Sequence, residues 1–188
     1  MTQHSPPEQT PRLLLTCGDV AGVGPEVVVR SLAALLPQRD LRTVIVGCPE
    51  VVRRAVELLS LGWEVATITE CGDDWSRTGR LVVWNPSKSE VQDVQAGVAD
   101  GRAGRAAYDW LVASTRAALA GKVDAIVTAP LSKLGLSRAG IHYPGHTEIL
   151  AAECGVAEVA MMLYLPEGEP LVPGHSLSIA HATLHTSI

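Results

Sequence analysis

The first candidate site is a histidine and a threonine, His146 and Thr147, at the start of a predicted helix. They follow a Pro-Gly pair and precede an apolar segment, residues 149–152. A helix start offers free N–H groups, and with an imidazole and a hydroxyl beside them it suits an anion such as phosphate. The pattern indicates a site for a phosphorylated small-molecule substrate. A structural interpretation is also open, in which Thr147 is only the N-cap of the helix.

The elements before this pair would place it near the end of a strand. Residues 123–128 form an apolar run, followed by Ala129-Pro130 and a polar stretch, predicted as a loop, that contains Lys133. Ligands of α/β proteins bind beyond the carboxyl ends of strands. Lys133 could therefore neutralise an anionic substrate or cofactor, although a solvated lysine explains it equally well.

A glycine-rich segment, residues 18–26, follows the first predicted strand. It reads GDVAGVGPE, which is not the G-x-G-x-x-G pattern of a dinucleotide loop, and Pro25 lacks an N–H at the helix start. Its glycines permit a tight turn, and Glu26 complements the helix dipole. Asp19 is the one residue of this loop whose carboxylate could face a cleft.

Four motifs in order resemble the 4-hydroxythreonine-4-phosphate dehydrogenase family of vitamin B6 biosynthesis. The first motif carries valine at its third position, where the family usually has proline. Together they extend across nearly the whole chain, which makes the resemblance specific. They lie at residues 18–26 (GDVAGVGPE), 101–108 (GRAGRAAY), 127–133 with 145–148 (VTAPLSK and GHTE), and 182–185 (ATLH).

The resemblance implies residue roles and cofactors. His146 and Thr147 would contact the substrate, and His185 would be one of three histidines that hold a divalent metal (Zn, Co or Mg), the other two lying beyond residue 188. His181 has the spacing to share a strand face with His185 and could substitute as a ligand. No catalytic residue is assigned. NAD(P) would accept a hydride from the alcohol of 4-phosphooxy-L-threonine, with decarboxylation following.

The resemblance also implies a fold and an assembly. The fold would be the α/β sandwich of isocitrate and isopropylmalate dehydrogenases, and the full-length enzyme would be a homodimer. The chain ends soon after His185, so it resembles the N-terminal portion of a longer enzyme. Three alternatives stay open: a catalytically incompetent remnant that binds at most a phosphorylated ligand, a relative that oxidises phosphorylated threonate or erythronate, and one that acts on aromatic dihydrodiols.

Composition restricts the function classes. Hydrophobic residues make up 47% and charged residues 19% of the chain, and phenylalanine is absent. A core of Val, Leu, Ile and Ala suits a buried parallel sheet covered by helices. A net charge of −5 without a basic face argues against nucleic acid, and no apolar run is long enough to cross a bilayer.

The termini and the cysteines indicate a cytoplasmic location. Residues 1–10 are polar and Pro-rich and read as a loose tail without the features of a signal peptide. The cysteines form no C-x-x-C pair, so we expect reduced, buried thiols. They are Cys17, Cys48, Cys71 and Cys154.

Strands alternating with helices predict an α/β fold with a parallel or mixed sheet. Residues 11–128 would form part of a first α/β domain, and residues 129–188 the incomplete start of a second. The predicted strands are 13–16, 43–46, 64–69, 81–84, 123–128, 160–165 and 176–183, and the predicted helices are 25–36, 49–59, 102–120 and 149–154.

Overall fold

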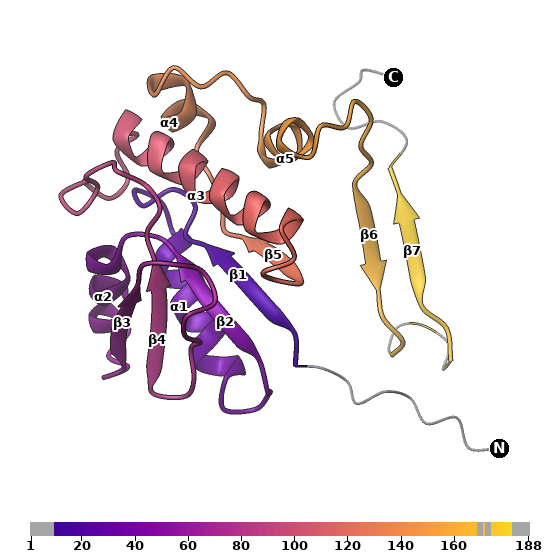
Figure 1. Ribbon diagram of the computed structural model, residues 1–188, viewed down its shortest axis with the longest axis horizontal. Coiled ribbons are helices and arrows are strands. Elements are labelled where there is room, and N and C mark those ends of the chain that lie inside the picture. The colour runs from indigo at the N-terminus through magenta and orange to yellow at the C-terminus, as the bar shows by residue number, and fades with distance from the viewer. Residues whose placement is uncertain (1–9, 169–170, 172–173, 182–188) are drawn as a thin grey trace. The chain divides into compact units, whose positions relative to one another are not determined.

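The computed structural model describes residues 10–168, 171 and 174–181 (Figure 1). The chain forms two compact units, Met1–Cys154 and Gly155–Ile188. The division therefore follows the helix that ends at Cys154, whereas the sequence placed a domain boundary after Thr128. The assignment of residues 129–188 to a second domain stays a prediction.

The first unit holds most of the regular structure (Figure 1). Strands alternate with helices along it, as the sequence predicts. Its elements are β1 (Arg12–Thr16), α1 (Gly24–Leu35), β2 (Arg42–Val46), α2 (Pro49–Leu58), β3 (Glu64–Ile68), β4 (Arg80–Trp84), α3 (Gly101–Leu119), β5 (Ala125–Thr128), α4 (Lys133–Arg138) and α5 (His146–Cys154).

The strands of this unit form one parallel sheet in the order β3-β4-β2-β1-β5. Chain order runs from β1 to one side of the sheet, through β2, β3 and β4, and then returns to place β5 on the other side of β1. The two neighbours of β1 are thus reached in opposite directions, which makes the carboxyl ends of β1 and β5 a topological switch point. The α/β prediction with a parallel sheet is confirmed.

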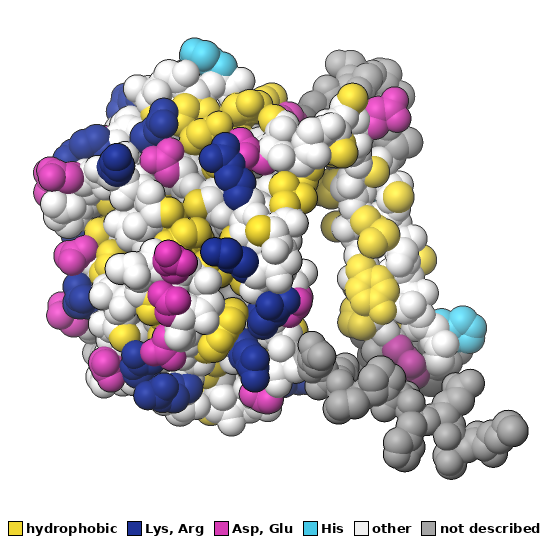
Figure 2. Space-filling view, in the orientation of Figure 1, with side chains coloured by type: hydrophobic (Ala, Val, Ile, Leu, Met, Phe, Trp, Pro, Cys, Tyr) yellow, Lys and Arg dark blue, Asp and Glu magenta, His cyan; other side chains and the backbone are white. Residues whose placement is uncertain are grey.

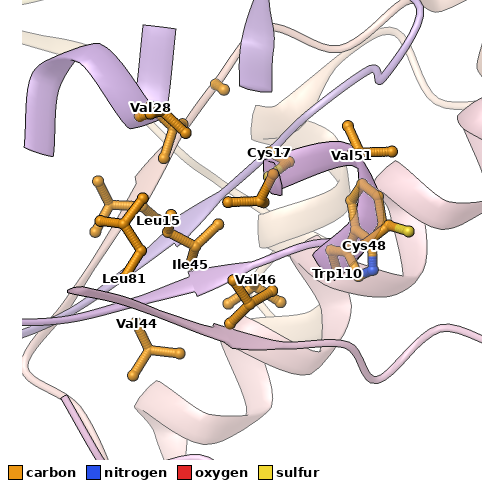
Figure 3. Close-up of a cluster of buried hydrophobic side chains, with 14 of the residues drawn as sticks. Leu15, Cys17, Val28, Val44, Ile45, Val46, Cys48, Val51, Leu81 and Trp110 are labelled. Atoms are coloured by element: carbon orange, nitrogen blue, oxygen red, sulfur yellow. The ribbon is translucent and has the colours of Figure 1, made fainter. Parts of the chain in front are cut away.

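The core is built from aliphatic strand residues. The β2 residues Val44, Ile45 and Val46 are each 0% exposed, as expected for a parallel sheet buried on both faces. Figure 3 shows them with side chains from the packed helices, among them Val28 of α1 and Trp110 of α3. The core contains no phenylalanine, and branched aliphatic side chains fill it.

Local sequence explains where the long helices begin. Pro25 stands in the first turn of α1 and Pro49 in that of α2, where the missing N–H costs nothing. The carboxylate of Asp100 accepts a hydrogen bond from the backbone N–H of Arg102 at 2.7 Å and caps α3. Among the described residues, no helix combines the length and the apolarity needed to cross a bilayer.

The second unit contains β6 (Met162–Leu165) and β7 (Leu177–Ala180), which form a two-stranded antiparallel sheet. The sequence predicted longer strands at 160–165 and 176–183, and residues 182–183 lie outside the described residues.

Two details of the sequence interpretation are wrong. Residues Lys133–Arg138 form the short helix α4 and not a loop, because tertiary packing stabilises a segment whose glycine and serine disfavour a helix. Cys154 is exposed, whereas Cys17, Cys48 and Cys71 are buried free thiols.

Candidate functional site at the carboxyl ends of β1 and β5

The loops that follow β1 and β5 meet at the switch point. The N–H of Ala129 donates to the carbonyl of Thr16 at 3.1 Å, and the N–H of Asp19 donates to the carbonyl of Pro130 at 2.9 Å. These two bonds continue the β1–β5 pairing past the ends of the strands. The glycine-rich loop and the Ala129-Pro130 turn are thereby held together.

Glycine is required where the glycine-rich loop and the Ala129-Pro130 turn approach each other most closely. Gly18 has φ +64°, and a Cβ placed there would lie 2.2 Å from the carbonyl oxygen of Pro130. A Cβ on Gly24 would lie 2.1 Å from the carbonyl oxygen of Cys17. The glycines at positions 18 and 24 therefore serve close backbone packing.

Asp19 lies buried in this loop, with 8% of its surface exposed. Its Oδ1 accepts a hydrogen bond from the N–H of Ala21 at 2.9 Å. One carboxylate oxygen is thus used to close the loop. The structure places Asp19 at the switch point, and a contact between its carboxylate and a substrate stays a prediction.

Glu26 is a candidate that the sequence analysis treated only as a partner of the helix dipole. It stands in the first turn of α1, and its Oε2 is buried without a hydrogen-bond partner in the described part of the chain. A buried carboxylate oxygen is unfavourable without a partner.

Burial, together with the nearby Cys48 and Glu26, raises the pKa of the Cys17 thiol to about 12, so that thiol is an inert core group.

His146 is the first residue of α5 and is partly buried. Burial lowers the pKa of its imidazole below the ordinary 6.5, and a hydrogen bond with the backbone of Ala129 opposes this shift. A hydrogen bond from a ring N–H to a carbonyl oxygen stabilises the protonated ring and therefore raises its pKa. The lowered pKa favours the neutral imidazole at pH 7, and the ring lies beside the backbone at the end of β5.

Thr147 is the second residue of α5 and is partly buried. The helix begins one residue earlier, so the interpretation of Thr147 as the N-cap is wrong. Its hydroxyl and the unpaired N–H groups of the first helical turn lie together at one helix end. This is the arrangement that suits an anion.

Lys133 is exposed and begins α4. The hydroxyl of Ser132 caps this helix by accepting from the N–H of Gly135 at 3.0 Å. The α4 backbone lies directly against α3, since a Cβ on Gly104 would lie 2.1 Å from the carbonyl oxygen of Gly135. Arg138 adds a hydrogen bond to the carbonyl of Ala99. Short as it is, α4 therefore holds Lys133 at a defined place.

A second apolar cluster positions α5. Ile149 of α5 is 1% exposed and packs with Leu111 of α3 and Leu136 of α4. The rings of Tyr108 and Tyr143 stack with centroids 6.2 Å apart, which holds the segment before α5 against α3. Helices α3 and α4 thus fix the start of α5.

The metal prediction rests on a residue outside the described part. His185 lies in 182–188, which the structure does not describe. His181 is partly buried, and its backbone N–H donates to the carbonyl of Met161 at 2.8 Å. Within the described ranges, no three His, Cys, Asp or Glu residues are grouped as a metal site would require. Those residues alone do not fit a catalytic metal.

A cavity of about 870 Å³ lies elsewhere, between α3 and the segments that follow β3 and β4. Basic side chains on its rim include Arg105, Arg116 and Lys122. Figure 2 shows dark blue side chains beside yellow ones on this unit. The cavity contains none of the candidate residues at the switch point, so we do not assign it to the same site.

The structure brings together part of the predicted site. Asp19 and His146 are joined to consecutive residues, Pro130 and Ala129, and Thr147 is adjacent to His146. Fold and site therefore define an α/β protein with a helix start and a neutral imidazole at the switch point of a parallel sheet.

Comparison with known proteins identifies the family. Residues 39–188 match the family model described as "Pyridoxal phosphate biosynthetic protein PdxA". The chain belongs to this family. That membership confirms the resemblance drawn from the four motifs.

The relatives show both the likeness and its extent. The chain is 33% identical over 182 residues to the 4-hydroxythreonine-4-phosphate dehydrogenase of Geobacter metallireducens, covering 97% of the chain and 51% of the relative. It is 33% identical over 180 residues to the D-threonate 4-phosphate dehydrogenase of Pectobacterium atrosepticum, covering 94% and 51%. The chain spans about half the length of these relatives.

A solved structure of the same family is similar to the chain. The crystal structure of a 4-hydroxythreonine-4-phosphate dehydrogenase from Burkholderia phymatum superposes with a TM-score of 0.83 at 34% identity, covering 96% of this chain and 52% of the other. The match in length supports the expectation that the chain corresponds to an N-terminal portion.

Proposed function

We propose that the chain supplies half of the active site of a dehydrogenase that oxidises a phosphorylated four-carbon hydroxy acid. The observation that carries this proposal is the partly buried imidazole of His146 at the start of α5, beside the backbone of Ala129 where β1 and β5 end. The substrates would be 4-phosphooxy-L-threonine or D-threonate 4-phosphate, since relatives at equal identity are named for each. The first would place the enzyme in pyridoxal phosphate biosynthesis.

Each residue has a role that follows from its chemistry. We assign one ring N–H of His146 to the Ala129 carbonyl, which would leave the other nitrogen of the neutral imidazole with a lone pair for the substrate. That nitrogen accepts a hydrogen bond from the substrate hydroxyl and can hold its proton. The Thr147 hydroxyl and the N–H groups of the first turn of α5 bind the phosphate. The exposed ammonium of Lys133 adds positive charge nearby.

We propose that the redox chemistry also needs residues from the remaining half of the family's length. NAD(P) would accept the hydride, and a divalent metal (Zn, Co or Mg) held in part by His185 would polarise the alcohol. Among the described residues, no three His, Cys, Asp or Glu side chains are grouped as the metal would require. Oxidation of 4-phosphooxy-L-threonine would give a β-keto acid that loses carbon dioxide.

Two further parts of the proposal concern the cell and the assembly. The unpaired thiols of Cys17, Cys48 and Cys71 support a cytoplasmic location. The family resemblance supports a homodimer for the full-length enzyme.

A ligand titration tests the proposal. We expect 4-phosphooxy-L-threonine and D-threonate 4-phosphate to shift the NMR resonances of the His146 ring and the Thr147 amide, at concentrations at least tenfold below those needed for inorganic phosphate. The variants His146→Gln and Thr147→Val should each weaken binding about tenfold, as for one hydrogen bond to a charged group. The matched control is Thr67→Val on β3, far along the sheet. Equal binding by all four proteins would refute the proposal.

The pH dependence supplies a second test. Because the folded pKa of His146 lies below that of the unfolded chain, the unfolded state binds the proton first as pH falls. The first unit should lose stability as pH falls from 6.5 towards the folded pKa, and His146→Gln should flatten this part of the curve. An NMR midpoint for His146 at or above that of a histidine peptide would contradict a buried, neutral ring.

A further inference from the structure

We propose that a pocket at the amino ends of β2 and β4 binds a small organic phosphate. This pocket, called here the arginine pocket, has a volume of about 350 Å³. Its basic members are Arg39, Arg42 and Arg77, and the indole of Trp75 also lines it. The inference concerns a second site in the first unit and does not depend on the reaction proposed for the switch point.

The arginine pocket lies at the opposite end of the sheet from the candidate active site. One wall is the segment 36–42, which joins α1 to β2, and the other is the segment 74–78, which precedes β4. Both segments lie at the lower end of the first unit in Figure 1, whereas α4 and α5 lie at its upper end. β2 is five residues long, which corresponds to about 16 Å. One small ligand therefore cannot occupy both sites.

Hydrogen bonds hold the wall before β4 in place. The N–H of Ser76 donates to the carbonyl of Thr43 at 2.8 Å, and the Ser76 Oγ accepts from the N–H of Val82 at 2.9 Å. The carboxylate of Asp74 forms an ion pair with Arg80 at 2.7 Å. This wall is therefore attached to both β2 and β4, so the pocket is formed before a ligand binds, as most small-molecule sites are.

The three arginines of the pocket lack protein partners. In the part of the chain that the structure describes, the side chains of Arg39, Arg42 and Arg77 form no hydrogen bond and no ion pair, whereas Arg102 forms ion pairs with two carboxylates at 2.8 Å. Figure 2 shows dark blue side chains beside magenta ones at this lower end of the unit. Each of the three guanidinium groups therefore keeps its donors for another acceptor.

The carboxylates of the pocket do not balance these charges. Asp74 is already paired with Arg80, and this hydrogen bond is the main reason why the pKa of Asp74 is lowered. Asp40 accepts a hydrogen bond from the Thr10 hydroxyl and forms no ion pair within the described ranges. Three guanidinium groups thus share the pocket with one carboxylate that is not already paired. Like charges repel each other, and an anion bound between them removes this repulsion.

The shape and the lining define the class of ligand. Guanidinium groups are planar donors whose geometry matches phosphate. The volume lies at the lower end of the range of about 300–1,000 Å³ for small-molecule sites. Trp75 is partly buried and offers a flat apolar wall. A phosphate monoester with a small flat organic group fits these features, and the net charge of −5 disfavours a long polyanion.

An NMR titration of the full chain tests the inference. We expect phenyl phosphate to shift the resonances of the Trp75 indole N–H and the Ser76 amide, with an affinity at least tenfold higher than that of inorganic phosphate, because the phenyl ring packs on the indole. The variants Arg42→Gln and Arg77→Gln should each weaken binding about tenfold, as for one hydrogen bond to a charged group. The matched control is Arg30→Gln, an exposed arginine of α1 outside the pocket, which should change the affinity less than twofold.

Four outcomes would overturn the proposal. Shifts at Trp75 that do not saturate, or an equal loss of affinity in Arg30→Gln, would mean that the arginines act only through the general charge of the surface. Equal affinities for benzoate and phenyl phosphate would mean that the pocket is not a phosphate site. Equal affinities for inorganic phosphate and phenyl phosphate would remove the indole from the site. Shifts confined to His146 and Thr147 would mean that organic phosphates bind only at the switch point.

The same spectra keep this inference apart from the proposed function. The Trp75 and Ser76 resonances report the arginine pocket, and the His146 and Thr147 resonances report the start of α5. Binding at one pair of resonances without binding at the other would refute one proposal and leave the other standing. Circular dichroism melting curves check that each variant is folded.

Discussion

The sheet of the first unit and the hairpin of the second use the same kinds of residue with opposite results. In β2, Val44, Ile45 and Val46 are 0% exposed, whereas Leu163 of β6 is 53% exposed and Ile179 of β7 is 49% exposed. The runs look alike in the sequence. The difference is that helices of the same unit cover the first sheet, and no element of the second unit covers the hairpin within the described residues. An apolar run therefore predicts a need for burial, but it does not show whether elements of the same unit meet that need.

The largest change in the free energy of unfolding should come from a substitution in the core of the first unit. Trp110 is 0% exposed, and its Nε1–H donates to Asn85 Oδ1 at 2.9 Å. Trp110→Ala should lower the free energy of unfolding by about 3–5 kcal/mol, because it leaves a cavity and removes the hydrogen bond to Asn85 Oδ1, which then accepts only from the N–H of Ser87. Chemical denaturation followed by circular dichroism measures this. Trp63→Ala, at a partly buried position, serves as the control and should cost clearly less.

An intermediate effect should come from the contact between α3 and α4. Gly104→Ala places a Cβ 2.1 Å from the Gly135 carbonyl oxygen, so α4 must move. We expect a loss of about 1–3 kcal/mol, as for overpacking, together with weaker ligand binding as Lys133 shifts. The control is Gly22→Ala, whose Cβ would meet its nearest atom at 3.4 Å. Equal stability of the two variants would mean that the helices are not in close contact.

The smallest effect should come from the hairpin. Leu163→Ala should change the free energy of unfolding of the chain by less than about 0.5 kcal/mol, because the side chain is already half exposed. The same denaturation experiment measures it. A loss above 1 kcal/mol would show that the hairpin is packed in the isolated chain.

Much of the fold was predictable from the sequence. Proline at helix starts, aliphatic runs of strand length and glycine after helices located α1, α2, α3 and strands β1 to β5 within a few residues. α4 was missed because Gly135 is unfavourable in a helix, and only its contact with Gly104 of α3 explains it. The exposure of Cys154 was missed because cysteine is usually buried.

The candidate site was predictable in part. The GHTE motif and the loop before it drew attention to His146, Thr147 and Lys133, and the glycine-rich loop drew attention to Asp19. The sequence did not indicate Glu26 as a site residue, because a buried oxygen without a partner cannot be seen in a sequence. The roles of all these residues, and of His185, stay predictions.

The sequence by itself determined the alternation of strands and helices, the family and the chemical groups available for a site. Short-range periodicity and motif spacing are sufficient for those. Only the tertiary structure decided that Asp19 and His146 lie beside the consecutive residues Pro130 and Ala129, and that burial lowers the pKa of His146. Each of these depends on residues far apart in the chain, and on how much solvent their neighbours exclude.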